Sequence, residues 1–378
     1  MRKIDNALKN IFVQATSQSL ACLVYCYDFE KTKSYINNIG IKIIGEFKFI
    51  NALAIDTSYD CAKKLSTQTF VKFLSAATTA FALVDISKKI IGIDKITTCT
   101  KNMNVAIIDT GISMHLDFVM PTNRIVKFID LVNQRKAPYD DNGHGTFVAG
   151  VFAGNGLVSN QKYAGFAPQC NIIAIKALNN KGEGNAVQIL SAMQWICDNC
   201  KKYNIKVVCM SFGSEPLGSL DPIMKGAEKL WSKGIIVVAA AGNSGANFQT
   251  IKSPGISGKI ITVGGMNDNR ANNTFKENDF EIAKFSSRGP ALGRYKPDCV
   301  APSVDIVSCG LNDFYTTLSG TSVATPMVAG ICVQLLAQKS NLKPDQVKRL
   351  LLKSCKSILK NAGNKRNIEG FGYPNFNN

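Results

Sequence analysis

Short apolar runs in the first quarter of the chain alternate with two amphipathic stretches, and together they predict a small α+β unit. The helical patterns cover residues 30–39 and 59–67, and Gly40 ends the first of them. Strand-like runs lie at residues 20–27, 41–49, 52–57, 70–75 and 80–85. A charged link, Ser87-Lys88-Lys89, follows, so we place one domain at residues 1–90 and a second at residues 91–378.

In the second domain, buried-strand runs alternate with helical patterns. Helices are expected at residues 186–202 and 221–233. Strands are expected at residues 104–108, 172–177, 207–211, 235–240 and 260–263. Continuous apolar strands separated by helices indicate a mostly parallel sheet that is covered by helices on both faces. The sequence therefore predicts a small α+β domain, followed along the chain by an α/β fold with three layers, α/β/α.

The apolar and basic segments limit the partners that we expect. The longest apolar runs, residues 235–241 and 328–337, are shorter than the roughly 20 residues of a membrane helix, and we interpret them as a buried strand and a core helix. The formal charge is +17, and nine of the 44 basic residues lie between Lys339 and Arg366. Such a run is usually the solvated face of an amphipathic helix. No zinc-finger, RNP or Walker pattern accompanies it, so we expect neither a membrane nor a nucleic acid as partner.

The N-terminus and the cysteines bear on location. Arg2 and Lys3 begin the chain, but polar residues interrupt the place of a signal core, and we expect no Sec signal. The twelve cysteines are scattered, several within apolar runs, which fits thiols in a reducing cytoplasm. A non-Sec exit or release by lysis is left open. Cys197 and Cys200 form a C-x-x-C pair, but two histidines are too few to complete a zinc site, so no metal is expected there.

Three segments carry candidate chemistry, although each has a structural alternative when taken alone. Asp109 ends the apolar run of residues 105–108, where open α/β sheets place their active sites, but such an acid can also cap a helix. His144 lies between two glycines, which leave its ring accessible. Ser322 begins a helix after a turn at Gly320, beside free amides that can stabilise an oxyanion, although serine is also a favoured N-cap.

Taken together, the three residues point to one chemistry. Their order along the chain, Asp109, His144 and Ser322, is the order of the subtilisin triad. The surrounding motifs resemble those of the subtilisin-like serine proteases, family S8. These motifs are Asp109-Thr110-Gly111-Ile112, His144-Gly145-Thr146, Ala239-Ala240-Ala241-Gly242-Asn243-Ser244-Gly245 and Gly320-Thr321-Ser322. The resemblance covers roughly residues 92–340 and implies a serine endopeptidase that works through an acyl-enzyme and cleaves protein or peptide substrates.

The same resemblance implies roles for residues outside the triad. Asn243 would donate its side-chain amide to the oxyanion. Ser211, Phe212 and Gly213 would form an edge that pairs with an extended substrate. Ala240, Ala241 and Gly242 would line the opposite wall of the pocket for P1, the residue before the cleaved bond. Because these wall residues are small, the pocket would have room for a bulky apolar P1 side chain. Alternatively, the small residues simply allow close packing.

The first domain resembles the inhibitory propeptide (I9 type) of this family in its element order and in residues 49–53. The resemblance implies a ferredoxin-like domain that assists folding and inhibits the protease as an intramolecular partner, with cleavage near Ser87 to Ile91. The chain resembles the intracellular subtilisins in two respects, its lack of a recognised signal and its cysteine usage.

Three features differ from the family pattern. Phe147 stands where many relatives have a second histidine, and Val323 replaces a frequent methionine; neither change removes a proton-transfer group. Residues 153–162 lack carboxylates, so the sequence supports no structural calcium and no other cofactor. The alternative functions are a catalytically silent scaffold that regulates a partner protein and, less in keeping with the motifs, a nucleic-acid-binding protein. A silent scaffold usually lacks a triad member, and here all three are present.

Overall fold

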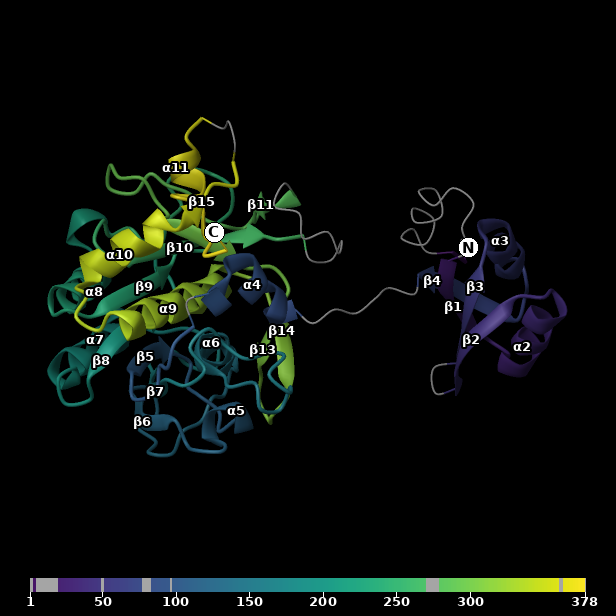
Figure 1. Ribbon diagram of the computed structural model, residues 1–378, viewed down its shortest axis with the longest axis horizontal. Coiled ribbons are helices and arrows are strands. Elements are labelled where there is room, and N and C mark those ends of the chain that lie inside the picture. Colours follow the sequence, from purple (N-terminus) through teal and green to yellow (C-terminus); the bar gives the residue numbers. More distant parts are fainter. Residues whose placement is uncertain are drawn as a thin grey trace. The chain divides into compact units, whose positions relative to one another are not determined.

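The computed structural model describes residues 3–4, 20–48, 51–76, 83–95, 97–269, 279–359 and 363–377. It divides the chain into two units, Met1–Phe81 and Ala82–Asn378 (Figure 1). This boundary lies before the expected one because α4 (Leu83–Ile91) belongs to the second unit. Ser87 and Ile91 are buried there, and the Ile91 carbonyl accepts a hydrogen bond from the Phe376 amide. The strand expected at residues 80–85 is therefore wrong from Leu83 onward, and residues 80–82 lie outside the described residues.

The first unit has the element order β-α-β-β-α-β, which is ferredoxin-like. Its elements are β1 (Leu20–Cys26), α2 (Phe29–Asn38), β2 (Lys42–Phe47), β3 (Ala52–Thr57), α3 (Tyr59–Ser66) and β4 (Val71–Ala76). The antiparallel sheet has the order β2-β3-β1-β4. Asp28 and Ser58 begin the two helices by accepting hydrogen bonds from backbone amides, which agrees with their preference for N-caps. The predicted order of elements is confirmed as far as β4.

The second unit is built on an eight-stranded sheet. Its order is β11-β10-β9-β8-β5-β7-β6, and β12 pairs with β10. Apart from the antiparallel pair β10–β11, the pairs are parallel. The strands are β5 (Asn104–Asp109), β6 (Ile125–Asp130), β7 (Asn171–Lys176), β8 (Ile205–Met210), β9 (Ile236–Ala240), β10 (Ile261–Asn267), β11 (Glu281–Ile282) and β12 (Cys299–Pro302). The predicted, mostly parallel sheet is confirmed.

Helices pack on this sheet in two pairs, α6 (His144–Ala153) with α9 (Thr321–Gln338), and α7 (Ala186–Asn199) with α8 (Pro222–Ser232). By length and composition α9 could cross a membrane, but 83% of its span is buried inside the protein, as in a core helix. Among the described residues, one β-hairpin, a second antiparallel pair of strands that are distant in the chain, and three other α-helices complete the unit. They are α5 (Leu116–Val119), β13 (Ile306–Cys309), β14 (Tyr315–Leu318), α10 (Pro344–Lys353), β15 (Cys355–Lys356), α11 (Lys365–Ile368) and β16 (Tyr373–Pro374).

The strand order places β5 at a topological switch point. The chain continues from β5 to β6 and β7 on one side of the sheet, and then crosses to β8, β9 and β10 on the other side. In open α/β sheets, ligands bind outside the carboxyl ends of the strands at such a point. Asp109, Ser211 and Ala241 end or directly follow β5, β8 and β9, and they therefore lie at the same edge of the sheet.

Candidate active site

Asp109 and His144 form a buried acid–imidazole pair. Asp109 is the last residue of β5 and only 1% exposed, and its Oδ1 lies 2.7 Å from the Nδ1 of His144. The same Oδ1 accepts a hydrogen bond from the Thr110 amide at 2.8 Å. Because Asp109 accepts at Nδ1, the neutral imidazole keeps its proton there and leaves Nε2 free to act as a base.

A second carboxylate shapes the turn that presents His144. Asp140 is buried, and its Oδ1 accepts hydrogen bonds from the Asn142 and Gly143 amides. Its Oδ2 accepts from both the amide and the hydroxyl of Thr146, at 2.9 and 2.7 Å. Gly143 has φ +100°, a left-handed conformation that favours glycine, and α6 begins at the next residue, His144. Asp140 therefore closes the first turn of α6 and fixes the position of the histidine.

Burial and neighbouring charges act in opposite directions on His144. Burial favours the neutral imidazole and lowers the pKa of His144. Asp109 raises the pKa of His144 through its charge and its hydrogen bond, and Asp140 raises it through its charge. The net effect is a His144 pKa above the ordinary value. Asp140 itself has a lowered pKa: burial raises it, but the backbone and side-chain donors of its turn outweigh burial. Asp140 therefore stays a carboxylate at neutral pH.

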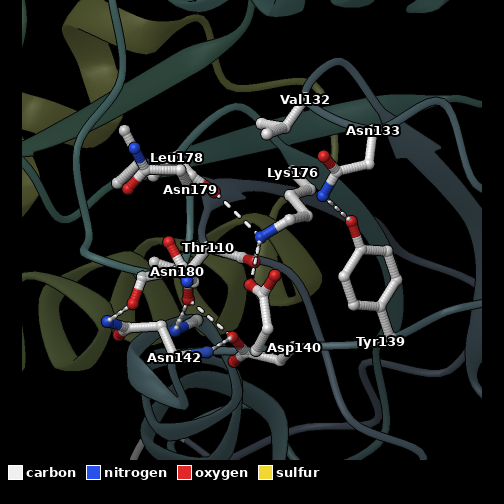
Figure 2. A network of polar contacts seen from close by, with 12 residues as sticks. Thr110, Val132, Asn133, Tyr139, Asp140, Asn142, Lys176, Leu178, Asn179 and Asn180 are labelled. Atoms are coloured by element: carbon white, nitrogen blue, oxygen red, sulfur yellow. Dashed lines mark hydrogen bonds and ion pairs between the residues drawn. The ribbon is translucent and has the colours of Figure 1, made fainter.

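Lys176 holds the ends of β5 and β7 together behind this turn (Figure 2). Its side chain is fully buried, and its ammonium donates to the carbonyls of Thr110 and Leu178, at 2.6 and 3.0 Å. It also pairs with the Asp141 carboxylate at 2.6 Å and lies 5.1 Å from the centre of the Tyr139 ring. Lys176 thus joins the strand that carries Asp109 to the loop that carries His144. The sequence analysis did not identify it, because a lysine at a strand end is usually exposed.

Ser322 and Asn243 come together from distant parts of the chain. Ser322 is the second residue of α9, and Asn243 follows β9. The amide and hydroxyl of Thr321 both donate to the Oδ1 of Asn243, at 2.9 and 3.0 Å, so its Nδ2 is left to face the site. A side chain added at Gly320 would place Cβ 3.1 Å from Ser322 Oγ and 3.2 Å from Asn243 Nδ2. The serine hydroxyl and the amide group therefore face the same small space.

One cavity of about 540 Å³ contains most of the residues expected at the site. It is lined by His144, Ser211, Phe212, Gly213, Ala240, Gly242, Asn243 and Ser322, among others. Asp109 lies behind His144. Ala241 is not part of the lining: it is fully buried and packs with a separate apolar cluster that includes Ile251. Several other lining residues, among them Leu178, Lys181 and Lys252, were not expected from the sequence.

The segment that follows α6 does not fit a calcium ion. Asp117 is its buried neighbour, and the amides of Gly156 and Val158 donate to the two Asp117 carboxylate oxygens, at 3.1 and 3.0 Å. The Tyr315 hydroxyl also donates to this carboxylate, at 2.8 Å. Calcium requires oxygen ligands, whereas here N–H and O–H donors occupy the carboxylate. We therefore assign no role to a metal at this position.

The chain has clear relatives. Residues 100–373 match the subtilase family. Serine protease AprX of Bacillus subtilis (strain 168) is 43% identical over 277 residues, a match that spans 66% of this chain and 60% of AprX. Subtilisin E of the same organism is 29% identical over 362 residues, covering 90% of this chain and 87% of that protein. The solved structure of sphericase superposes with a TM-score of 0.64 at 27% identity, covering 79% of this chain and 99% of sphericase. This chain belongs to the subtilase family.

Proposed function

We propose that this protein is a serine endopeptidase whose triad is Asp109, His144 and Ser322. The observation that carries the proposal is the 2.7 Å contact between Asp109 and His144 at a cavity that Ser322 and Asn243 also line. The names of AprX and subtilisin E support the reaction class. A silent scaffold, the alternative, is not favoured by any feature of the described site, where all three groups and Asn243 are present.

In this proposal each group has one task. The Oγ of Ser322 attacks the peptide carbonyl while the Nε2 of His144 takes its proton, and the same proton then passes to the leaving amine. Asp109 keeps the imidazole oriented and stabilises the imidazolium that forms. The Nδ2 of Asn243 and the backbone amide of Ser322 meet the oxyanion. Water then releases the acyl group, with His144 again acting as the base.

An extended substrate would lie between two backbone segments. Ser211-Phe212-Gly213 follows β8, and the other segment contributes Ala240, the last residue of β9, and Gly242, which lies just after this strand. Edge pairing provides affinity through the substrate's main chain and makes little demand on its sequence. Selectivity must then come from the side-chain pockets, above all the P1 pocket.

We further propose that the first unit is a propeptide that inhibits the protease until it is removed. The match to subtilisin E covers more of the chain than the second unit alone can supply, so it includes part of the first unit. Cleavage near Ser87 to Ile91, the sequence-based expectation, does not suit the fold, since both residues are buried in α4 and a cleaved segment must enter the site extended. We therefore propose cleavage before Leu83, at the boundary between the units.

Labelling of Ser322 at different pH values tests the proposed reaction. We expect a fluorophosphonate probe to attach to Ser322 in the matured protein. The labelling rate should rise with pH, because only the neutral imidazole accepts the serine proton. The midpoint should lie above the ordinary histidine value of about 6.5, since Asp109 and Asp140 raise the pKa of His144. Peptide mapping identifies the labelled residue, and a rate that is flat between about pH 5 and 8 would contradict His144 as the base.

Asn243 provides a second test within the same site. We expect Asn243→Ala to lower kcat by about 10²–10³-fold, because one oxyanion donor is lost in the transition state. KM should change little, since the amide makes no comparable bond to the ground-state substrate. Steady-state kinetics on a peptide substrate measures both constants, and the melting temperature measures the separate effect of losing the two hydrogen bonds from Thr321. A rise in KM at constant kcat would instead indicate a role in substrate binding.

A further inference from the structure

Lys252 lines the cavity between the two segments proposed to bind substrate, and the inference drawn from it rests on the proposed function. Its amide donates to the Ala241 carbonyl at 2.9 Å, which joins it to the segment after β9. The next residue, Ser253, exchanges two backbone hydrogen bonds of 2.9 Å with Ser214, which joins it to the segment after β8. Residue 252 therefore closes the space between the two walls.

The aliphatic stem of Lys252 fits between two glycines. A Cβ added at Gly213 would lie 2.6 Å from the Cβ of Lys252, and one added at Gly242 would lie 2.5 Å from its Cγ. Neither Gly213 nor Gly242 can therefore carry a side chain while Lys252 keeps this position. The small wall residues, which suggested room for an apolar P1 group, instead accommodate the lysine stem.

The charge at this end of the cavity is positive. The Lys252 side chain is 19% exposed, and its ammonium pairs with Glu215, whose side chain is 81% exposed. A second lysine, Lys181, also lines the cavity, and among its described lining residues none carries a carboxylate. An exposed carboxylate is held weakly by such a pair, because water screens it and its side chain is free to move. Glu215 is thus a partner that another carboxylate can replace.

We propose that this pocket selects an acidic P1 side chain, with glutamate preferred, and that Lys252 determines the selectivity. The substrate carboxylate takes the place of Glu215 beside the ammonium, while Glu215 returns to solvent. An apolar P1 side chain would displace water from the ammonium and offer it no acceptor, which is unfavourable. A cationic P1 side chain would be repelled by the Lys252 ammonium, and Lys181 adds a second positive charge to the same cavity.

Matched peptides test this proposal. We expect the matured enzyme to cleave a peptide with P1 glutamate about tenfold faster, in kcat/KM, than the same peptide with the isosteric P1 glutamine, a ratio typical of one charged hydrogen bond. Lys252→Met keeps most of the stem and removes the charge, so it should bring this ratio close to one. Glu215→Gln should raise the ratio, since the competing carboxylate is gone. Peptides with P1 leucine and P1 lysine complete the series.

The outcomes separate this inference from the proposed function. If wild type and Lys252→Met both label at Ser322 but cleave P1 glutamine or leucine as well as P1 glutamate, the proposed activity stands and the acidic preference is wrong. If the ratio of kcat/KM for P1 glutamate over P1 glutamine is high in the wild type and equally high in Lys252→Met, the role of Lys252 is overturned. Another residue then determines the preference, and Lys181 is the next candidate. If Ser322 takes no label in any of these proteins, the proposed function fails and the inference fails with it.

Discussion

The Ser322→Ala protein is expected to remain at full length under conditions in which the wild-type chain loses its first unit. Removing the nucleophile should reduce peptide hydrolysis by about 10⁴-fold or more, because no acyl-enzyme can form. If maturation is self-processing, the same change should also stop cleavage at the boundary between Phe81 and Ala82. No acidic residue lies between residues 77 and 82, so we expect this cut to occur in cis, where the high effective concentration of the tethered segment offsets an unfavourable P1 side chain. Intact mass spectrometry of both proteins, incubated side by side, measures the cleavage and locates it to one bond.

Two controls make this result decisive. Mature wild type added in excess to Ser322→Ala shows whether the boundary can be cut in trans, and a cut confined to the boundary, with the second unit left intact, indicates that the variant is folded. A wild-type product that begins within α4, after Ser87, would contradict the proposed cleavage site. If Ser322→Ala matures by itself at the wild-type rate, the cut is made by another protease and self-processing is wrong.

Asp109→Asn should lower kcat by about 10⁴-fold while the fold is retained. An asparagine can present its amide hydrogens to Nδ1, which favours the tautomer with the proton on Nε2, and that nitrogen can then no longer accept the serine proton. The shape of the side chain is kept, but the Thr110 amide binds the same Oδ1 and loses this acceptor when the asparagine turns its amide group toward Nδ1. With the carboxylate absent, the raised pKa of His144 should also fall, so the remaining activity should have a lower pH midpoint. A pH–rate profile measures both effects.

Asp117→Asn is the matched control for this change. Asp117 is also a buried carboxylate that accepts backbone amide hydrogens, but it lies among Gly156, Val158 and Tyr315 and does not line the cavity. We expect its replacement to lower the melting temperature and to leave kcat and the pH midpoint unchanged. If both variants lose activity equally, general damage to the unit explains the loss, and Asp109 has no special role.

Much of the fold could be predicted from the chain because its apolar pattern is regular. The buried runs that became β5, β7, β8 and β9 have few polar interruptions, so their ends could be placed within one or two residues. The helix α4 was missed because residues 83–85 were assigned to a strand, although Leu83, Ile86 and Ile90 recur at helical spacing. The predicted domain boundary followed the charged link at residues 87–89, which lies within this helix.

Only those residues of the candidate site that belong to a recognisable sequence motif could be predicted. Asp109, His144, Asn243 and Ser322 are embedded in glycine-rich motifs, and the structure places the last three around one cavity with Asp109 behind them. Lys252 and Lys176 carry no such signal. Each acts through neighbours that are distant in sequence, such as Gly213 for Lys252 and Thr110 for Lys176. Contacts of this kind follow from the way in which distant segments pair, which no local pattern encodes.

The parallel strand order has a consequence for the time course of folding. Adjacent parallel strands need a long crossover between them, so β5 can pair with β7 and β8 only after distant segments have met. Loop-closure entropy is lost before such contacts form, and topologies rich in non-local pairings fold slowly. The first unit contains a local hairpin, β2–β3, and leaves the ribosome first. It is therefore expected to reach its native structure while the sheet that carries the candidate site is still assembling.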